Sequence, residues 1–344
     1  MVKSYKAKCI FLLIFAPCLY SSISGYFKVN SFYLNYSNEF SSIQLLRFRL
    51  KIEKSWNSFS FKLHSETNAL NGSEKFYSLF TGSLLEELNP FYLYKGNQLK
   101  VYHFFDKLSL SYKTEKFIFG MGRERIPWGK AKLFSVLDMF NPYNPFSLEK
   151  EEKQGVNSLR IQYYFTGFSW VESVYVRRNG RNYYGSAVFF SSGHTDINFC
   201  IFSITGEMIY GAAFEGSKGR FVFRGELAVK KEKKSLMSDL SIGADYQLSS
   251  KIYLIGEYFS SDGSELYPKG KVFVIIGDYQ ISALSRIQFG YFNTSPGNGN
   301  FLFLRFSYDI SKNLDTHIGF LYSKAGSSAW QFPKIAYAGI SFFY

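Results

Sequence analysis

Residues 45–53 read LLRFRLKIE, and from Leu46 onward polar and apolar side chains alternate along this stretch. One face holds Leu46, Phe48, Leu50 and Ile52, and the other holds Arg47, Arg49, Lys51 and Glu53. Successive side chains of a β-strand point to opposite faces, so a period of two predicts a strand with one apolar and one wet face. The same alternation returns in residues 219–229, 240–248 and 301–310.

Runs of this kind, each about ten residues long, recur along the whole chain, and ten residues is roughly what a tilted strand needs to cross a bilayer. We expect strands at residues 25–36, 42–53, 58–69, 99–113, 115–125, 155–165, 168–178, 182–191, 194–204, 206–215, 219–230, 238–248, 251–260, 271–281, 284–294, 300–310, 313–323 and 333–344. The predicted fold class is all-β: a transmembrane antiparallel up-and-down β-barrel of about 16–18 strands, with an in-folded constriction loop.

The connections between these runs support a barrel, because long and short links alternate. Links such as SWNS, KTEK, SSGH and SALS are tight, whereas residues 70–98, 126–154 and 230–239 form long ones on the other side. Outer-membrane barrels have short periplasmic turns and longer external loops. The alternative is a soluble all-β protein. With aromatic residues making up 20% of the chain, it would have to hide Phe and Tyr on both faces of its sheets.

The N-terminus has the order of a secretory signal peptide. Lys3, Lys6 and Lys8 precede an apolar run over residues 9–20, and small residues follow. We expect cleavage of residues 1–24, which leaves a single barrel domain over residues 25–344. A membrane anchor needs about 20 apolar residues, and this run is shorter. Cleavage would leave Cys200 as the one cysteine, which predicts neither a disulfide framework nor a cysteine metal site.

Residues 126–154 are too apolar for an exposed loop, and three prolines divide them into short pieces. We therefore expect this segment to fold into the barrel and to pack its apolar side chains against the inner wall. The residues expected to make this packing are Trp128, Phe140, Tyr143 and Phe146.

The same region resembles a known group of proteins. Gly122-Arg123, Trp128-Gly129, DMFNPYNP at 138–145 and EEKQGVNSLR at 151–160 resemble a signature of uncharacterised porin-like outer-membrane proteins of Gram-negative bacteria, loosely akin to alginate-export barrels. The resemblance covers about 45 of the 344 residues, and Glu124 stands where glutamine is expected. It implies a porin-like barrel with a constriction loop between the fifth and sixth strands, and it implies no particular substrate.

Charged residues on the polar faces are candidates for the pore lining. We expect the pore and its constriction to be lined by Arg47, Arg49, Arg123, Arg125, Arg160, Glu257 and Asp278. Asp245, Glu257 and Asp278 would form an acidic wall opposite the basic wall of arginines. The acidic and basic walls together would set a transverse electric field across the pore. The alternative is that these charges form ordinary ion-pair networks, and both interpretations can hold together.

No pattern in the chain points to an enzyme. The four histidines are scattered without an HExxH motif, and His103, in VYHFFDK at 101–107, is the single candidate for a catalytic Ser-His or Asp-His pair. A structural role for His103 is the simpler interpretation. We therefore expect no catalytic residue, no metal and no cofactor.

These features together predict a porin-like channel of the bacterial outer membrane for passive diffusion of small hydrophilic solutes, with a modest preference for anions. The alternatives are a non-conducting structural or assembly barrel and, further off, a barrel enzyme. Without the signal peptide the net charge is about +10, which in an exported chain favours lipopolysaccharide and outer-membrane lipids over nucleic acid as partners. The aromatic C-terminal strand at 336–344 resembles the signal read by the barrel-assembly machinery. The sequence leaves the oligomeric state open.

Overall fold

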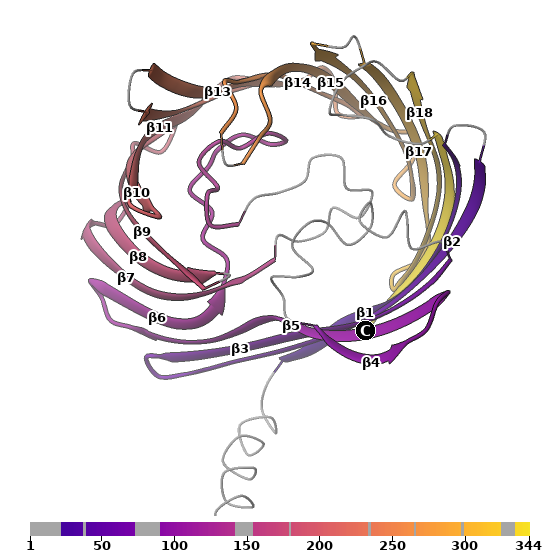
Figure 1. Cartoon of the computed structure of the whole chain (residues 1–344), viewed down its shortest axis with the longest axis horizontal. Helices are drawn as coiled ribbons and strands as arrows, with labels where there is room; N and C mark the ends of the chain where they lie inside the picture. Colours follow the sequence, from indigo (N-terminus) through magenta and orange to yellow (C-terminus); the bar gives the residue numbers. More distant parts are fainter. Residues whose placement is uncertain are drawn as a thin grey trace, which may run out of the picture.

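The computed structural model describes residues 22–36, 39–72, 90–141, 154–178, 180–232, 235–264, 266–296, 299–324 and 334–344. Within these ranges one antiparallel sheet closes on itself to form a barrel (Figure 1). Closure occurs where β1 (Ser22–Tyr36) pairs with β2 (Glu39–Trp56) on one side and with β19 (Lys334–Phe343) on the other. A closed sheet has no open edge, so each spanning strand can pair its backbone with both neighbours, as a hydrocarbon environment requires.

The remaining strands follow in chain order. They are β3 (Phe59–Gly72), β4 (Phe91–Lys95), β5 (Leu99–Lys113), β6 (Phe117–Glu124), β7 (Val156–Thr166), β8 (Ser169–Arg178), β9 (Arg181–Ser191), β10 (Thr195–Ile204), β11 (Glu207–Lys218), β12 (Phe221–Glu232), β13 (Ser235–Gln247), β14 (Ile252–Ser261), β15 (Gly270–Gln280), β16 (Ser285–Ser295), β17 (Gly299–Ser311) and β18 (Leu314–Lys324).

β4 is an addition to the ring, since it pairs along part of β5 only, while β5 also pairs with β3 and β6. The other strands form a closed eighteen-stranded antiparallel barrel. The predicted all-β barrel is therefore confirmed, at the upper end of the expected strand number.

The two faces of the wall are inverted relative to a soluble protein. On β2 the Phe48 side chain is 44% exposed and points outward, whereas Arg49 beside it points inward and is 3% exposed. The same pattern holds on other strands, for example with Phe223 outside and Arg224 inside on β12. An apolar outer surface of this extent needs a lipid environment rather than water.

Two predicted boundaries differ from the structure. β4 was not expected, because it is only five residues long and its sequence FYLYK shows no alternation. Residues 230–239 were expected to form a long loop, but β12 continues to Glu232 and β13 begins at Ser235. Charged residues at the barrel rim can keep pairing as strands beyond the apolar belt, and a periodicity argument based on apolar residues misses them.

Several predictions concern residues outside the described ranges. These are most of the predicted signal peptide, because the described residues begin at Ser22, and Tyr143 and Phe146 of the loop. Their roles remain predictions. Among the described residues, no helix is long and apolar enough to span a membrane.

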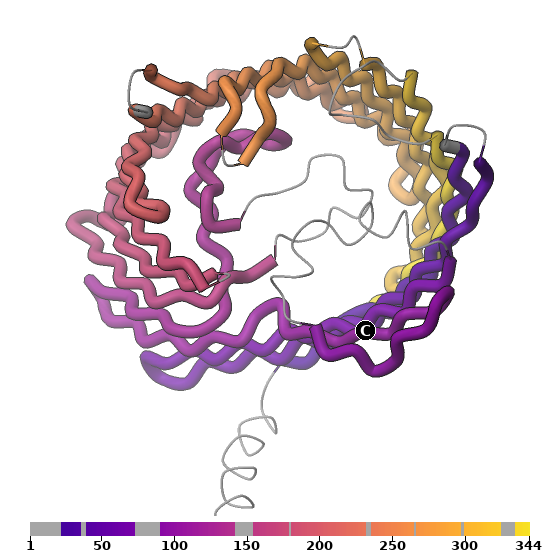
Figure 2. The backbone as a smooth tube through the Cα atoms, viewed as in Figure 1, coloured from indigo at the N-terminus to yellow at the C-terminus, as the bar shows by residue number. Residues whose placement is uncertain are grey.

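After β6 the chain leaves the wall and enters the barrel. Figures 1 and 2 show the segment that follows β6 lying inside the ring, along the wall formed by the strands from β8 to β14. We call residues 126–141 the inner segment, and we call the end of the barrel at which β6 ends and β7 begins the external end. The inner segment contains no helix or strand.

Candidate functional site

The inner segment is anchored first by its apolar side chains. Trp128, Phe134 and Phe140 are each at most 1% exposed. The Trp128 ring lies 5.1 Å from the ring of Phe202 on β10, and Phe134 stacks on Phe259 of β14 at 5.0 Å between centroids. Burial of one large aromatic side chain contributes on the order of 2–3 kcal/mol, so these residues hold the segment firmly against the inner wall.

Glycines in the wall make room for these side chains. A Cβ atom at Gly185 on β9 would lie 2.7 Å from the Trp128 ring and 2.8 Å from the Phe140 ring. A Cβ atom at Gly211 on β11 would lie 2.5 Å from Leu137. The wall therefore has shallow slots at two positions where any larger residue would collide with the inner segment.

The backbone of the inner segment has no strand partner, so its N–H groups need other acceptors. Glu226 on β12 supplies one set. Its carboxylate accepts hydrogen bonds from the Ser135 hydroxyl at 3.0 Å and from the backbone N–H groups of Lys130, Ala131, Val136 (2.8 Å) and Leu137 (3.2 Å). One buried wall carboxylate thus satisfies donors from both ends of an eight-residue turn.

Glu257 on β14 supplies a second set. Its carboxylate accepts hydrogen bonds from the backbone N–H groups of Lys132 at 3.1 Å, Leu133 at 3.2 Å and Phe134 at 2.7 Å. Hydrogen bonds to a charged acceptor are about twice as strong as neutral ones. Glu257 was expected to line the pore. The structure places it 3% exposed beneath the inner segment, where it acts as a clamp.

Further polar contacts fix the two ends of the segment. Asp138 accepts hydrogen bonds from the N–H groups of Trp128 and Gly129 at 3.0 and 2.9 Å. The Trp128 indole N–H donates to Glu172 on β8 at 2.7 Å, and the Asn198 side chain on β10 donates to the Trp128 carbonyl at 3.1 Å. Trp128 is therefore held through its backbone, its ring nitrogen and its ring faces.

Two lysines of the segment extend to wall carboxylates. Lys130 pairs with Asp196 on β10 at 3.1 Å, and Lys132 pairs with Asp245 on β13 at 2.8 Å. Burial lowers the pKa of Lys132, but its contacts with Asp245 and Tyr253 outweigh this effect and hold the pKa above its usual range. Lys132 therefore stays charged, and it compensates an acid that was expected to face the pore.

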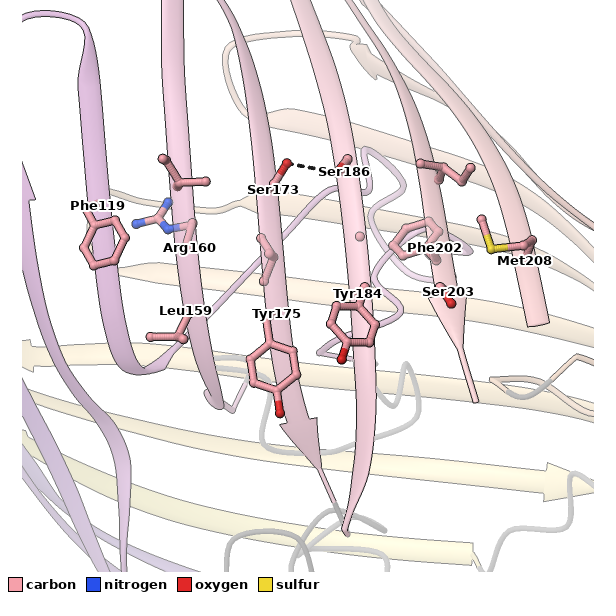
Figure 3. Close-up of a pocket in the computed structure, with 14 residues that line it drawn as sticks. Phe119, Leu159, Arg160, Ser173, Tyr175, Tyr184, Ser186, Phe202, Ser203 and Met208 are labelled. Atoms are coloured by element: carbon pink, nitrogen blue, oxygen red, sulfur yellow. Dashed lines mark hydrogen bonds between the residues drawn. The ribbon is translucent and has the colours of Figure 1, made fainter. Parts of the chain in front are cut away.

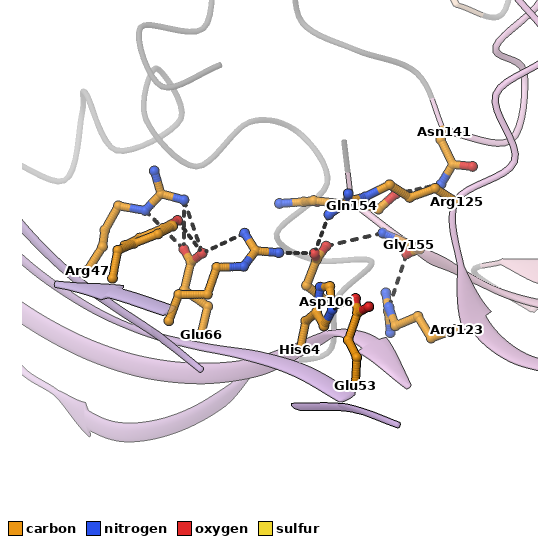
Figure 4. A network of polar contacts seen from close by, with 12 residues as sticks. Arg47, Glu53, His64, Glu66, Asp106, Arg123, Arg125, Asn141, Gln154 and Gly155 are labelled. Atoms are coloured by element: carbon orange, nitrogen blue, oxygen red, sulfur yellow. Dashed lines mark hydrogen bonds and ion pairs between the residues drawn. The ribbon is translucent and has the colours of Figure 1, made fainter. Parts of the chain in front are cut away.

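On the far side of the lumen, basic and acidic side chains alternate in a row (Figure 4). Arg47 and Arg49 of β2 donate to Glu66 of β3 at 3.0 and 3.1 Å, and Arg49 also contacts Asp106 of β5. Arg125, just after β6, donates to Asp106 at 2.6 Å. We call these five residues the arginine row. It holds three cations and two anions, and the Arg47 and Arg125 side chains keep 12% and 21% of their surface exposed.

Arg123 adjoins this row through Gly155 (Figure 4): it donates through Nε to the Gly155 carbonyl at 3.0 Å, and the Gly155 N–H donates to Asp106 at 3.3 Å. The remaining predicted residues lie apart from the row. Arg160 on β7 pairs with Glu124 at 3.0 Å and with Glu172 at 3.6 Å, beneath Trp128.

Asp278 lies on β15 and accepts a hydrogen bond from Gln288 at 2.8 Å, with Arg286 at 3.7 Å. Together with the arginine row, these contacts form ion-pair networks of the kind expected as the alternative to a basic wall facing an acidic wall. The structure thus groups three of the five predicted arginines, whereas of the two predicted acids Glu257 binds the inner segment and Asp278 binds Gln288 and Arg286 on the neighbouring strand.

The residues that sequence reasoning missed are the acids on the polar faces of strands: Glu66, Asp106, Glu172 and Glu226. Each sits at an inward position of a period-two strand, and that position is the signal the sequence carries. Their partners cannot be found in the same way, because Glu226 binds residues 89–96 positions away along the chain. Across the described ranges, no group of three or more His, Cys, Asp or Glu side chains is placed to hold a metal ion.

Comparison with known proteins gives a match at the level of structure only. No protein-family model matches the chain, and no curated protein matches it either. OccAB2 of Acinetobacter baumannii superposes with a TM-score of 0.63 at 10% identity, over 95% of this chain and 98% of that one.

Two further porin structures match over nearly their full length. OpdK of Pseudomonas aeruginosa, solved with vanillate, gives a TM-score of 0.58 at 8% identity, over 94% of this chain and 98% of that one. OmpF of Salmonella typhi, solved in complex with daunomycin, gives a TM-score of 0.52 at 12% identity, over 94% of this chain and 97% of that one.

The chain therefore has the fold of porin-like barrels of the Gram-negative outer membrane, which confirms the expected resemblance. The apolar outer surface and the closed ring suit a barrel that spans a lipid bilayer. The looser likeness to alginate-export barrels has no support in these structures.

Proposed function

We propose that the protein is a channel for passive diffusion of small hydrophilic solutes across the outer membrane. A barrel of eighteen strands is wide enough to leave an aqueous lumen. The observation that carries the proposal is the inner segment, which narrows this lumen while it is bound to one side of the wall by Glu226, Glu257 and its own aromatic side chains. A segment anchored in this way sets the size of a permeation path.

The solutes would include anions by preference, although the preference would be modest. The arginine row has one positive charge more than it has negative charges, and two of its guanidinium groups keep part of their surface exposed. Clusters of arginine at a constriction favour anions. The acids between the arginines reduce the local field, so a strong selectivity is not expected.

Reconstitution of the purified full-length protein into planar bilayers tests this proposal. We expect stepwise, ohmic conductance in symmetric KCl and a reversal potential displaced toward that of chloride in a KCl gradient. A barrel that inserts and resists detergent unfolding but never conducts at any voltage would contradict the proposal. Such a result would support the alternative of a structural or assembly barrel.

A further inference from the structure

Residues 130–137 of the inner segment form a turn whose backbone N–H groups bind two wall carboxylates. Residues 130, 131, 136 and 137 donate to Glu226, and residues 132–134 donate to Glu257. Neighbouring peptide groups therefore bind different glutamates, which brings the two carboxylates close together beneath one turn. We call Glu226 and Glu257 the glutamate clamp.

Among the described residues, no basic side chain pairs with either member of the glutamate clamp. Lys130 pairs with Asp196 instead. Lys132 and Arg224 both pair with Asp245. The residues opposite the two glutamates on the neighbouring strands are uncharged, namely Ala213, Ser241, Gly243 and Val274. The N–H groups of the turn therefore provide the main compensation for two buried negative charges.

Two further titratable groups face the same space. Asp239 of β13 is 3% exposed, and Tyr267, in the loop between β14 and β15, donates its hydroxyl to the Ser135 carbonyl at 3.1 Å. Burial, and then the charges of three nearby carboxylates, raise the pKa of Tyr267 well above its usual range, so its hydroxyl stays protonated. Tyr267 therefore adds no charge, and Asp239 adds a third acid beside the glutamate clamp.

A proton on either glutamate would disturb these contacts. Each of the four carboxylate oxygens already accepts at least one hydrogen bond from the turn. A protonated carboxyl group carries an O–H donor, which would face the N–H donors of the turn. The clamped turn therefore binds fewer protons than a released turn does. By linkage, release becomes more favourable as pH falls.

The Trp128 end of the inner segment has no comparable sensitivity to acid. Trp128 packs on Phe202 of β10, which Figure 3 shows with Arg160 of β7 on the same part of the wall. Its indole N–H donates to Glu172, and Arg160 lies 3.6 Å from that carboxylate. A neutral Glu172 can still accept from one indole N–H, and Asp138 binds N–H groups within the segment itself. We therefore expect this end to stay attached when the turn moves.

We propose that the glutamate clamp is an acid-sensitive latch. Uptake of protons by Glu226 and Glu257 releases residues 130–137 from the wall, while the Trp128 end stays attached. The permeation path then loses its fixed width, and the conductance becomes larger and noisier. Release of the turn depends on the fold alone, whereas its effect on conductance rests on the proposed channel function.

Hydrogen–deuterium exchange of the full-length protein in detergent tests the latch, because it reads the N–H groups of the turn directly. Exchange rates are compared with those of an unstructured chain at the same pH, at about pH 7 and about pH 4, a range in which buried glutamates titrate. We expect the protection of residues 130–137 to fall about 5- to 150-fold in acid, as for the loss of one buried hydrogen-bond acceptor. The strands should stay protected, and full protection of the turn should return at neutral pH.

Single variants assign the response to each glutamate. Glu226→Gln should lose protection at residues 130, 131, 136 and 137 already at neutral pH, and Glu257→Gln should lose it at residues 132–134. The double variant should show low protection at both pH values. Glu207→Gln, at the exposed start of β11, is the control and should respond to acid as the wild type does. Heat-dependent migration on gels shows that each variant is folded.

Planar-bilayer recordings at the same two pH values test the effect on permeation. We expect acid to raise the mean conductance and the current fluctuations of the wild type and to leave those of the double variant unchanged. A channel that conducts equally at both pH values while the turn is released would overturn the effect on permeation. A protein that never conducts but still releases the turn in acid would support the latch and contradict the proposed channel function.

Three results of the exchange experiment would overturn the latch itself. Equal protection of residues 130–137 at both pH values in the folded wild type would show that acid does not release the turn. Loss of protection throughout the strands in acid would indicate general unfolding of the barrel. A double variant with the same pH dependence as the wild type would assign the response to other groups.

Discussion

At the scale of single residues, one carboxylate carries much of the geometry of the lumen. Both oxygens of Glu226 accept hydrogen bonds, and its side chain is 2% exposed beneath the inner segment. Glutamine has nearly the same shape but only one acceptor oxygen, so its amide N–H groups would face backbone donors. A buried donor without an acceptor costs about 1–3 kcal/mol. Loss of this clamp should loosen the segment without unfolding the barrel.

We therefore expect Glu226→Gln to conduct with larger current fluctuations and a higher mean conductance than the wild type. Single-channel recording measures both quantities. Glu207→Gln is the matched control, because Glu207 sits at the exposed start of β11 and pairs only with Lys230 among the described residues. Quiet channels of wild-type conductance in Glu226→Gln would mean that the aromatic side chains and the other polar contacts, such as those of Glu257, hold the segment without the Glu226 carboxylate.

The arginine row supports a second prediction at this scale. Removal of Arg125 leaves two cations and two anions in the row, so its excess positive charge disappears. Arg125→Ala should shift the reversal potential in a KCl gradient toward that of potassium. Adding Arg123→Ala should shift it further by a smaller amount, because Arg123 is engaged with a backbone carbonyl.

The control for this measurement is Lys218→Ala combined with Arg220→Ala. This variant removes two positive charges beside the turn between β11 and β12, which lies away from the arginine row. Its reversal potential should stay close to that of the wild type. If Arg125→Ala leaves the reversal potential unchanged, the anion preference does not arise from the arginine row.

At the scale of elements, the inner segment packs against the wall at positions where the wall strands hold glycine. Gly185→Val places a branched side chain where the Trp128 and Phe140 rings now lie within 3 Å of the added Cβ position. The eighteen strands retain their pairing, so we expect a folded barrel from which the segment is displaced. Tryptophan emission should shift to longer wavelength, and conductance should rise.

Gly216→Val tests whether this effect comes from the slot itself. A Cβ atom at Gly216 on β11 would have its nearest neighbour at 3.7 Å, so that position has room for it. We expect wild-type emission and conductance there. Similar spectra for Gly185→Val and the wild type would show that the segment can move aside without leaving the wall.

The elements also show what the sequence alone can predict. The spanning strands were predictable because alternation and turn length are local properties, and the apolar content of residues 126–141 was enough to predict that they fold inward. β4 was not predictable, since five residues without alternation leave no period to detect. The clamps were not predictable either, because Glu257 binds residues 123–125 positions away and nothing local to either partner indicates the contact.

At the scale of the whole molecule, the barrel depends on one seam where the two ends of the sheet meet. β1 and β19 pair from Tyr26 opposite Phe343 to Asn35 opposite Lys334. The final residue locks the seam, because Gly25 and Tyr344 exchange backbone hydrogen bonds at 3.1 and 3.2 Å, and the Tyr344 hydroxyl donates to the Arg49 carbonyl at 2.8 Å. Closure thus involves β1, β2 and the C-terminus together.

Truncation after Ser341 removes the last three residues and with them the end of this seam. The shortened seam would leave backbone groups at the start of β1 without partners in lipid, at several kcal/mol for each unsatisfied group. We expect the truncated chain to lose the compact, detergent-resistant form that migrates differently before and after boiling. Tyr344→Phe should retain that form, since it removes one hydroxyl hydrogen bond worth about 1 kcal/mol and keeps the ring that stacks on Phe48. The truncated chain could instead keep the compact form when it refolds without other proteins. That result would show that the ring closes without its last three residues. The aromatic end would then act in recognition during assembly rather than in closure.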